Sequence, residues 1–177
     1  MTATMHVLTG PPGAGKTAVL ETLRPEINVC DEPARAVLAH QRAIGGRGTG
    51  EQDAELFVAR MLERTVRDFE RHAASGVTVL FDRGLPDLLG FARHYGLKTD
   101  AIERYCHRFR YNSRVFWFPH WPEIYVQDDE RRATADEADR FGDLLKQSYQ
   151  GLGYIVIDVP KRPVSDRAAF VKAELAR

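Results

Sequence analysis

One segment near the start of the chain constrains the fold more than any other feature. It reads Gly-Pro-Pro-Gly-Ala-Gly-Lys-Thr at 10–17 and matches the pattern Gly-x4-Gly-Lys-Thr. Its glycines permit backbone conformations that turn several N–H groups inward, where they can cradle phosphate groups. A short strand pattern at 6–8 precedes the segment and a helical pattern at 17–23 follows it. This context predicts a phosphate-binding loop between a strand and a helix of an α/β domain.

The residue types in this loop predict individual roles. Lys16 is expected to reach the β- and γ-phosphates of a nucleoside triphosphate, and the Thr17 hydroxyl to bind Mg²⁺. The positive N-terminal end of the helix that begins near Lys16 favours bound phosphate further. The predicted nucleotide-binding residues are Gly10, Pro11, Pro12, Gly13, Ala14, Gly15, Lys16, Thr17 and Ala18.

Short apolar strands alternate with helical patterns along the rest of the chain. Further strands are predicted at 27–30, 77–81, 114–118 and 153–159. Further helices are predicted at 33–44, 52–75, 85–95, 100–110, 135–152 and 165–175, with Ser165 as the cap of the last. Strands separated by helices indicate a parallel sheet. We therefore predict one domain over 1–177, an α/β fold with three αβα layers, a five-stranded parallel sheet and a small lid at about 127–141.

Composition narrows the classes of partner. The 177 residues contain 25 Lys and Arg against 25 Asp and Glu, so the formal net charge is zero and no overall field favours nucleic acid or a membrane. No apolar run is long enough to span a bilayer. The two cysteines, Cys30 and Cys106, are expected to be free thiols in a reducing compartment. We predict a cytoplasmic monomer or homodimer that binds neither nucleic acid nor membrane.

Charged residues follow the second and third predicted strands, whose carboxyl ends should meet at one crevice. Glu32 could accept a proton from a hydroxyl substrate, or could simply be an acid at a helix start. Asp82 follows an apolar run, as in a Walker B motif, and is predicted to face Mg²⁺ or to cap the next helix. Arg83 could hold a phosphate or the acceptor, or form a salt bridge with a neighbouring carboxylate. Asp87 is either a second polar contact or a solvated residue.

Three other groups are candidates for the site. The charged run at 128–132 lies where phosphotransferases place a lid, so Arg131 and Arg132 could neutralise the transferring phosphate; a solvated charge run is the alternative. Among the aromatic residues at 116–121, Trp121 is the better candidate for lining an acceptor pocket, and the others favour the core. Lys161 and Arg162 could cover the base of the nucleotide, or be solvated.

These motifs resemble a known family. The loop at 10–17, Glu32-Pro33-x-Arg35, the Asp82-Arg83-Gly84 segment and the aromatic run at 116–125 resemble small bacterial AAA-domain ATP-binding proteins related to the ribosylnicotinamide kinase domain of NadR-type proteins. The resemblance covers almost the whole chain and implies a fold similar to nucleoside and nucleotide kinases. In deoxynucleoside kinases the corresponding Glu is a base and the corresponding acid helps hold Mg²⁺, which implies these roles for Glu32 and Asp82. Gly84 departs from the Ser or Tyr of those kinases, which puts nucleoside specificity in doubt.

The sequence thus favours a phosphotransferase that moves the γ-phosphate of Mg·ATP to a hydroxyl of a small, nucleoside-like acceptor. The predicted catalytic residues are Lys16, Glu32, Asp82, Arg83, Arg131 and Arg132, with Thr17 and Asp82 as Mg²⁺ ligands. One alternative is an ATPase or GTPase switch that transfers no phosphate and acts on a protein partner. Another is a nucleoside monophosphate kinase, although a phosphate acceptor needs several arginines rather than two carboxylates.

Overall fold

The computed structural model describes residues 4–124 and 135–177. Five strands form one sheet: β1 (Met5–Thr9), β2 (Asn28–Cys30), β3 (Val79–Asp82), β4 (Arg114–Trp117) and β5 (Ile155–Asp158). Their order is β2-β3-β1-β4-β5 and every pairing is parallel. The predicted α/β fold with a five-stranded parallel sheet is therefore confirmed, and β1 lies at its centre.

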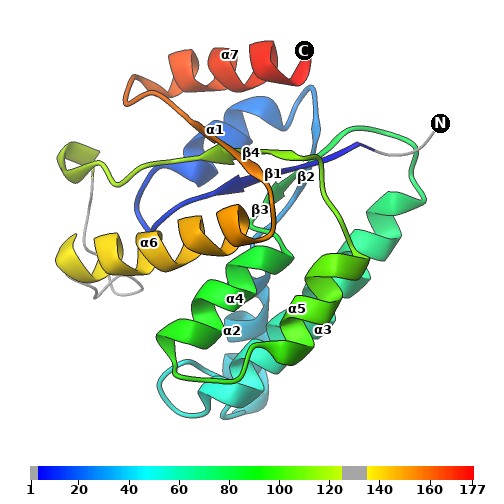
Figure 1. The fold of residues 1–177 in the computed structure, drawn as a ribbon, viewed down its shortest axis with the longest axis vertical. Coiled ribbons are helices and arrows are strands. Elements are labelled where there is room, and N and C mark those ends of the chain that lie inside the picture. The colour runs from blue at the N-terminus through cyan, green and yellow to red at the C-terminus, as the bar shows by residue number, and fades with distance from the viewer. Residues whose placement is uncertain (1–3, 125–134) are drawn as a thin grey trace.

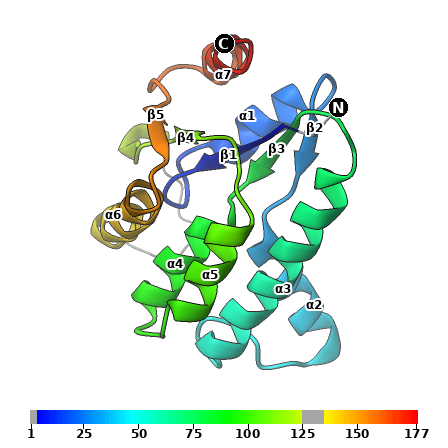
Figure 2. The ribbon, with the colours of Figure 1, turned by 45° about the vertical axis from the view of Figure 1, so that its right-hand side comes forward.

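Among the described residues, seven α-helices connect and cover the strands (Figure 1). They are α1 (Lys16–Leu23), α2 (Pro33–Ile44), α3 (Ala54–Ala73), α4 (Leu85–His94), α5 (Asp100–Arg108), α6 (Ala135–Gly151) and α7 (Val164–Leu175), with a short 3₁₀ helix at Pro122–Ile124. Figure 2 shows α1 and α7 on one side of the sheet and α3, α4, α5 and α6 on the other. Within the described residues, no helix is both long and apolar enough to cross a membrane.

Alternation along the strands separates the core into two halves. On β1, Val7 packs with residues of α3, α4 and α5, whereas the next residue, Leu8, packs with α1 and α7. Phe81 and Leu80 divide in the same way on β3. Successive strand residues point to opposite faces, so a sheet covered on both sides needs apolar residues at every position. This explains why the strands read as continuous apolar runs.

The helix and strand limits differ from the expected ones in two informative places. β3 begins at Val79 rather than at 77, and Val77 is exposed ahead of it. Helix α7 begins at Val164 with Pro163 at the N-cap position, so the predicted cap, Ser165, lies inside the first turn. Proline suits the start of a helix because its missing N–H would have no partner there.

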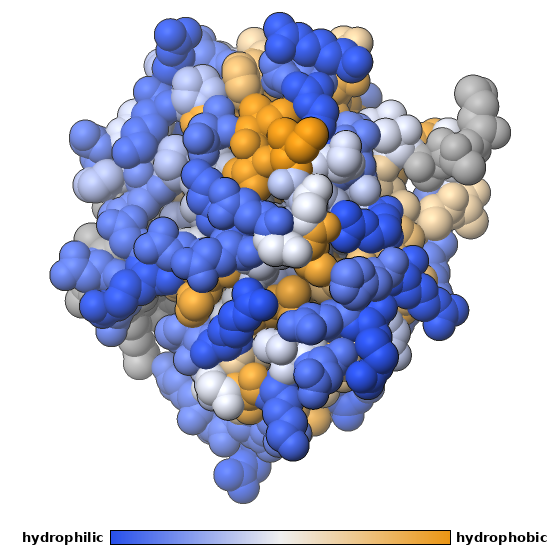
Figure 3. All heavy atoms as spheres, viewed as in Figure 1, coloured by the Kyte–Doolittle hydropathy of each residue, from blue (hydrophilic) through white to orange (hydrophobic). Residues whose placement is uncertain are grey.

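The surface is mostly hydrophilic in the view of Figure 3, and the largest hydrophobic area on this face lies near β5 and α7. β5 is an edge strand, and its Ile155 is 59% exposed. The two cysteines lie inside: Cys30 and Cys106 are buried and unpaired, as expected, and burial raises the pKa of each thiol to about 12.

Candidate functional site

The loop between β1 and α1 has the backbone that its glycines predict. Gly13 and Gly15 have φ angles of 76° and 80°, in the left-handed region that other residues avoid. Gly10 has φ 142°, and a Cβ there would clash with the carbonyl oxygen of Phe118, the residue after β4. Glycine is therefore required at Gly10 both for its backbone conformation and for the close approach of Phe118.

Lys16 is buried at the first turn of α1 and folds back over this loop. Its ammonium donates to the carbonyl oxygens of Gly10 and Pro11, each at 3.1 Å. Burial, with a smaller contribution from nearby Arg83, lowers the pKa of Lys16 to about 8. A bound phosphate would offer the ammonium a stronger, charged acceptor than these carbonyls. The geometry therefore suits a lysine that holds phosphate.

Arg83 occupies the centre of the site and has an unusual backbone. Its φ of 73° makes it the one non-glycine residue with positive φ among those described. Its buried guanidinium donates to Glu32 Oε1 at 2.8 Å, to Asp87 Oδ1 at 3.0 Å and to the Gly10 carbonyl at 3.0 Å. These bonds hold Arg83 in a conformation that costs about 1–3 kcal/mol for most residues. The salt-bridge arrangement considered from the sequence is the one present.

Glu32 precedes α2 and faces two arginines. Oε1 accepts from Arg83, and Oε2 accepts from Arg35 Nε at 3.2 Å. Burial alone would raise the pKa of this carboxyl, but Arg83 and then Lys16 outweigh it, so the pKa lies below its usual value. Glu32 is therefore ionised at neutral pH. An ionised carboxylate at this position can accept a hydrogen bond from a substrate hydroxyl, although it is a weak base.

Asp87, at the start of α4, is buried deeper than Glu32 and accepts hydrogen bonds from β1, from α6 and from the segment between β3 and α4. Oδ1 accepts from the Thr9 hydroxyl at 2.5 Å and from Arg83, and Oδ2 accepts from the Tyr149 hydroxyl at 2.5 Å and from the Gly84 N–H at 2.9 Å. Only 1% of this residue is exposed. The solvated Asp87 considered from the sequence is therefore wrong: it ties β1, the start of α4 and α6 to Arg83.

Asp82 at the end of β3 differs from Glu32 and Asp87 because one of its carboxylate oxygens has no hydrogen-bond partner within the part of the chain that the structure describes. It is buried, and its Oδ1 has no hydrogen-bond partner among the described residues. Burial raises the pKa of Asp82 to about 6, with Lys16 opposing the shift. An unsatisfied buried oxygen calls for a partner, and a hard cation is one. Asp82 and the Thr17 hydroxyl thus fit the donor set for Mg²⁺ beside a bound triphosphate.

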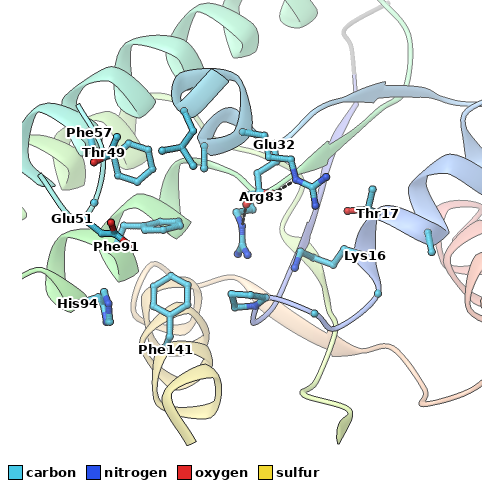
Figure 4. Close-up of a pocket in the computed structure, with 18 of the residues that line it drawn as sticks. Lys16, Thr17, Glu32, Thr49, Glu51, Phe57, Arg83, Phe91, His94 and Phe141 are labelled. Carbon is cyan, nitrogen blue, oxygen red and sulfur yellow. Dashed lines mark hydrogen bonds and ion pairs between the residues drawn. The ribbon is translucent and has the colours of Figure 1, made fainter. Parts of the chain in front are cut away.

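A cleft of about 1200 Å³ is lined by Lys16, Thr17, Glu32 and Arg83 (Figure 4), whereas Asp82 and Asp87 do not line it. At one end it is lined by the phosphate-binding loop, Val164 and Arg167, and at its middle by Glu32 and Arg83. Beyond Arg83 it continues between α2, the loop before α3, α4 and α6. Figure 4 shows Phe57, Phe91 and Phe141 grouped at that far end, on the opposite side of Arg83 from Lys16 and Thr17.

The far end is the part of the site that sequence reasoning missed. Phe91 contacts Phe57 edge-on, with ring centroids 6.4 Å apart, and Phe141 at 4.9 Å. Trp121, the aromatic residue expected in an acceptor pocket, does not line the cleft; its ring lies 5.3 Å from the guanidinium carbon of Arg167. The three phenylalanines come from three helices, so no local pattern marks them as a group.

Two other groups of residues were predicted in the site. Lys161 and Arg162 are exposed and do not line the cleft. Arg131, Arg132 and positions 127–134 of the predicted lid lie outside the described residues, while 135–141 form the first turns of α6. The lid and its arginines therefore stay predictions.

The fold matches solved nucleotide-binding proteins over nearly the whole chain. Deoxyadenosine kinase from M. mycoides, solved with the products dCMP and dCDP, superposes with a TM-score of 0.70 at 12% identity, covering 98% of this chain and 99% of the kinase. The YorR protein of Bacillus subtilis, solved with phosphorylated GDP, gives 0.64 at 14% identity, covering 98% and 96%. At such identities the likeness shows the fold alone. No curated protein matches the sequence significantly.

The sequence itself assigns the family. The loop, the strand-end carboxylates and all five strands fall within residues 5–167, which match the model described as AAA domain. This match spans most of the 177 residues. The chain therefore belongs to this AAA domain family, and it is a P-loop nucleotide-binding protein with a nucleoside-kinase-like fold.

Proposed function

We propose that the protein is a phosphotransferase that moves the γ-phosphate of Mg·ATP to a hydroxyl of a small, nucleoside-like acceptor. The observation that carries this proposal is the continuous cleft of about 1200 Å³, which extends from the phosphate-binding loop past Glu32 to three phenylalanines. Single-ligand sites usually occupy about 300–1,000 Å³, so this cleft has room for a donor and an acceptor together. A switch that only hydrolyses its nucleotide has no need for the second, aromatic end.

The chemical step follows from the order of groups along the cleft. The acceptor hydroxyl would donate a hydrogen bond to Glu32 and point its oxygen toward the γ-phosphorus. The new oxygen–phosphorus bond forms as the bond to the β-phosphate oxygen breaks, ADP leaves, and the hydroxyl proton passes to Glu32. Such transition states are loose, so little proton removal is needed early in the reaction. A weakly basic Glu32 that orients the hydroxyl is therefore sufficient.

The negative charge of the transition state would be stabilised from the side of the phosphate-binding loop. Lys16 would leave the Gly10 and Pro11 carbonyls for the β- and γ-phosphates. Mg²⁺, when bound by Thr17 and Asp82, would neutralise negative charge on the same two phosphates. Arg83 is already held by Glu32 and Asp87, so its part is to position Glu32 rather than to travel with the phosphate.

The ion pairs that Glu32 forms with two arginines argue against a nucleoside monophosphate acceptor. Arg35 and Arg83 both lie in the cleft, and both are bonded to Glu32. A phosphate-bearing acceptor would have to displace that carboxylate or be repelled by it. We infer a neutral acceptor with a flat ring that packs against Phe91. The link to ribosylnicotinamide kinases drawn from the sequence falls within this class and stays a proposal.

The experiment is ADP release from Mg·ATP, alone and with a panel of nucleosides, sugars and aminoglycosides. We expect one class of nucleoside-like compound to stimulate release at least about tenfold. Glu32→Gln should lower the stimulated rate about 100-fold or more while ATP affinity stays within about twofold. Glu63→Gln, at an exposed ion pair on α3, is the matched control and should change neither.

Two results would count against a kinase. If no compound stimulates ADP release and Glu32→Gln hydrolyses ATP as fast as the parent protein, the far end of the cleft is not an acceptor site. A slow turnover that depends on the presence of a protein would instead support the nucleotide switch.

A further inference from the structure

A second cationic and aromatic cluster lies at the phosphate-loop end of the cleft, opposite the three phenylalanines. Arg167 projects from the first turn of α7 and is only 4% exposed. Its guanidinium carbon is 5.3 Å from the ring centroid of Trp121 and 6.0 Å from that of Phe118. The chain thus buries a charged side chain, at a cost in hydration, on two rings that follow β4.

One hydrogen bond joins this cluster to the phosphate-binding loop. Arg167 Nη1 donates to the Ala14 carbonyl oxygen at 3.1 Å. Ala14 lies between the two glycines with positive φ, so Arg167 contacts the loop at its most curved part. The loop, α7 and the segment after β4 are therefore connected through a single guanidinium.

A second donor of the same guanidinium is unsatisfied. Arg167 Nε is buried and has no hydrogen-bond partner among the described residues. Buried donors are nearly always paired, and an unpaired one costs stability, so such a group points to a ligand. Arg167 and Val164 line the cleft, so the residue that carries the unpaired donor borders a space that a ligand can enter.

We propose that Arg167 binds the base of the donor nucleotide and that Trp121 positions it. A flat base that extends from the triphosphate toward α7 would meet a guanidinium plane already stacked on aromatic rings. The Nε–H would donate to a ring nitrogen or carbonyl oxygen of that base. Trp121 fixes the guanidinium through its cation–π contact and does not itself need to touch the nucleotide.

This proposal rests on nucleotide binding alone and holds whether or not phosphate is transferred to an acceptor. Its test is therefore a binding measurement, so that its failure is distinct from a failure of the proposed phosphotransfer. Mg·ATP and Mg·tripolyphosphate are the two probes, because they share the phosphate chain and differ by the nucleoside. Calorimetric titration gives the affinity for each.

We expect the parent protein to bind Mg·ATP at least about tenfold more tightly than Mg·tripolyphosphate. Arg167→Met keeps the aliphatic stem and should cost about tenfold in ATP affinity, the value of one hydrogen bond to a charged donor, with tripolyphosphate affinity unchanged within about twofold. Trp121→Ala should weaken ATP binding in the same selective way, and Trp121→Phe should restore most of it. Lys172→Met, exposed on the same helix, is the control and should change neither affinity.

An equal loss for both probes in Arg167→Met would overturn the proposal, because Arg167 would then only support the loop through Ala14. Equal affinity of the parent protein for the two probes would overturn it as well. A second measurement avoids changing Arg167 at all. In Trp117→Phe, Trp121 is the only tryptophan left of the two in the chain, so ATP should shift its fluorescence and tripolyphosphate should not. Equal responses to the two probes would contradict contact between Arg167 and the base.

Discussion

Replacing Asp87 by asparagine tests whether the centre of the site is held by this one carboxylate. Its two oxygens accept four hydrogen bonds, from Thr9, Arg83, Gly84 and Tyr149. Asparagine has a single acceptor oxygen, so its NH₂ group must face two of these donors. A hydroxyl can turn and accept, but the Arg83 guanidinium or the Gly84 N–H cannot. In either orientation one buried donor loses its partner, and Arg83 loses a counter-charge.

The expected size follows from these losses. Breaking a buried ion pair by removing one charge costs about 3–5 kcal/mol. For a domain of this length about 1 kcal/mol corresponds to 2–4 °C, so the melting temperature of Asp87→Asn should fall by about 6–20 °C. Urea unfolding followed by circular dichroism gives the free energy, with an unchanged dependence on urea concentration as the sign that the denatured state is unaffected.

Tyr149→Phe is the matched variant for this experiment. It removes one of the four donors and leaves the carboxylate, so it should cost about 1.5–3 kcal/mol. The double variant should lose less stability than the sum of the two single losses, since both substitutions remove the same hydrogen bond. A loss below about 1 kcal/mol in Asp87→Asn would refute the reasoning, because it would mean that Arg83 is held without this partner.

Three further predictions concern the candidate site. Because the pKa of Asp82 is raised to about 6 in the folded protein, ionising this carboxyl lowers the stability of the fold as pH rises from about 4 to about 6. Without ligand, Asp82→Asn should therefore be more stable than the parent protein above about pH 6. Thermal unfolding from about pH 4 to 8 should show the difference in melting temperature between the two proteins widen between about pH 4 and 6, and a constant difference would contradict this reasoning. Phe91→Leu should raise the acceptor KM about tenfold and leave the ATP KM unchanged, whereas Phe69→Leu, outside the cleft, should alter neither. Lys16→Met should weaken Mg·ATP about 10- to 100-fold in calorimetric titration, and an effect no larger than that of Lys146→Met would argue against phosphate contact.

The sequence was sufficient to predict the parallel sheet and the charged residues that follow its strands. The loop at 10–17 requires a strand before it and a helix after it, and alternating strands and helices leave a parallel sheet as the simple solution. Since parallel strands end at one edge, Glu32, Asp82 and Arg83 were expected near Lys16. The charges of all three act on the pKa of Lys16, and Arg83 forms an ion pair with Glu32. Local chemistry and sheet geometry carried these predictions.

Contacts between distant segments were beyond the sequence pattern. Asp87 and Tyr149 are 62 residues apart, and nothing local distinguishes either from an ordinary helix residue. Phe91 likewise fits the apolar face of α4, and only packing shows that it lines the cleft. Trp121 was expected in the acceptor pocket but packs against Arg167 of the last helix and does not line the cleft. These errors share a cause: tertiary packing of separate helices decides such contacts.

The buried thiols have a practical consequence for labelling. With a pKa of about 12, Cys30 and Cys106 carry almost no thiolate at neutral pH, and burial blocks the approach of a reagent. A maleimide dye should therefore leave the native protein unmodified without any cysteine having to be removed. A single cysteine introduced at exposed Ser165, two residues from Arg167, would then accept one fluorophore. The fluorescence of that label would report on changes near Arg167 in the folded protein.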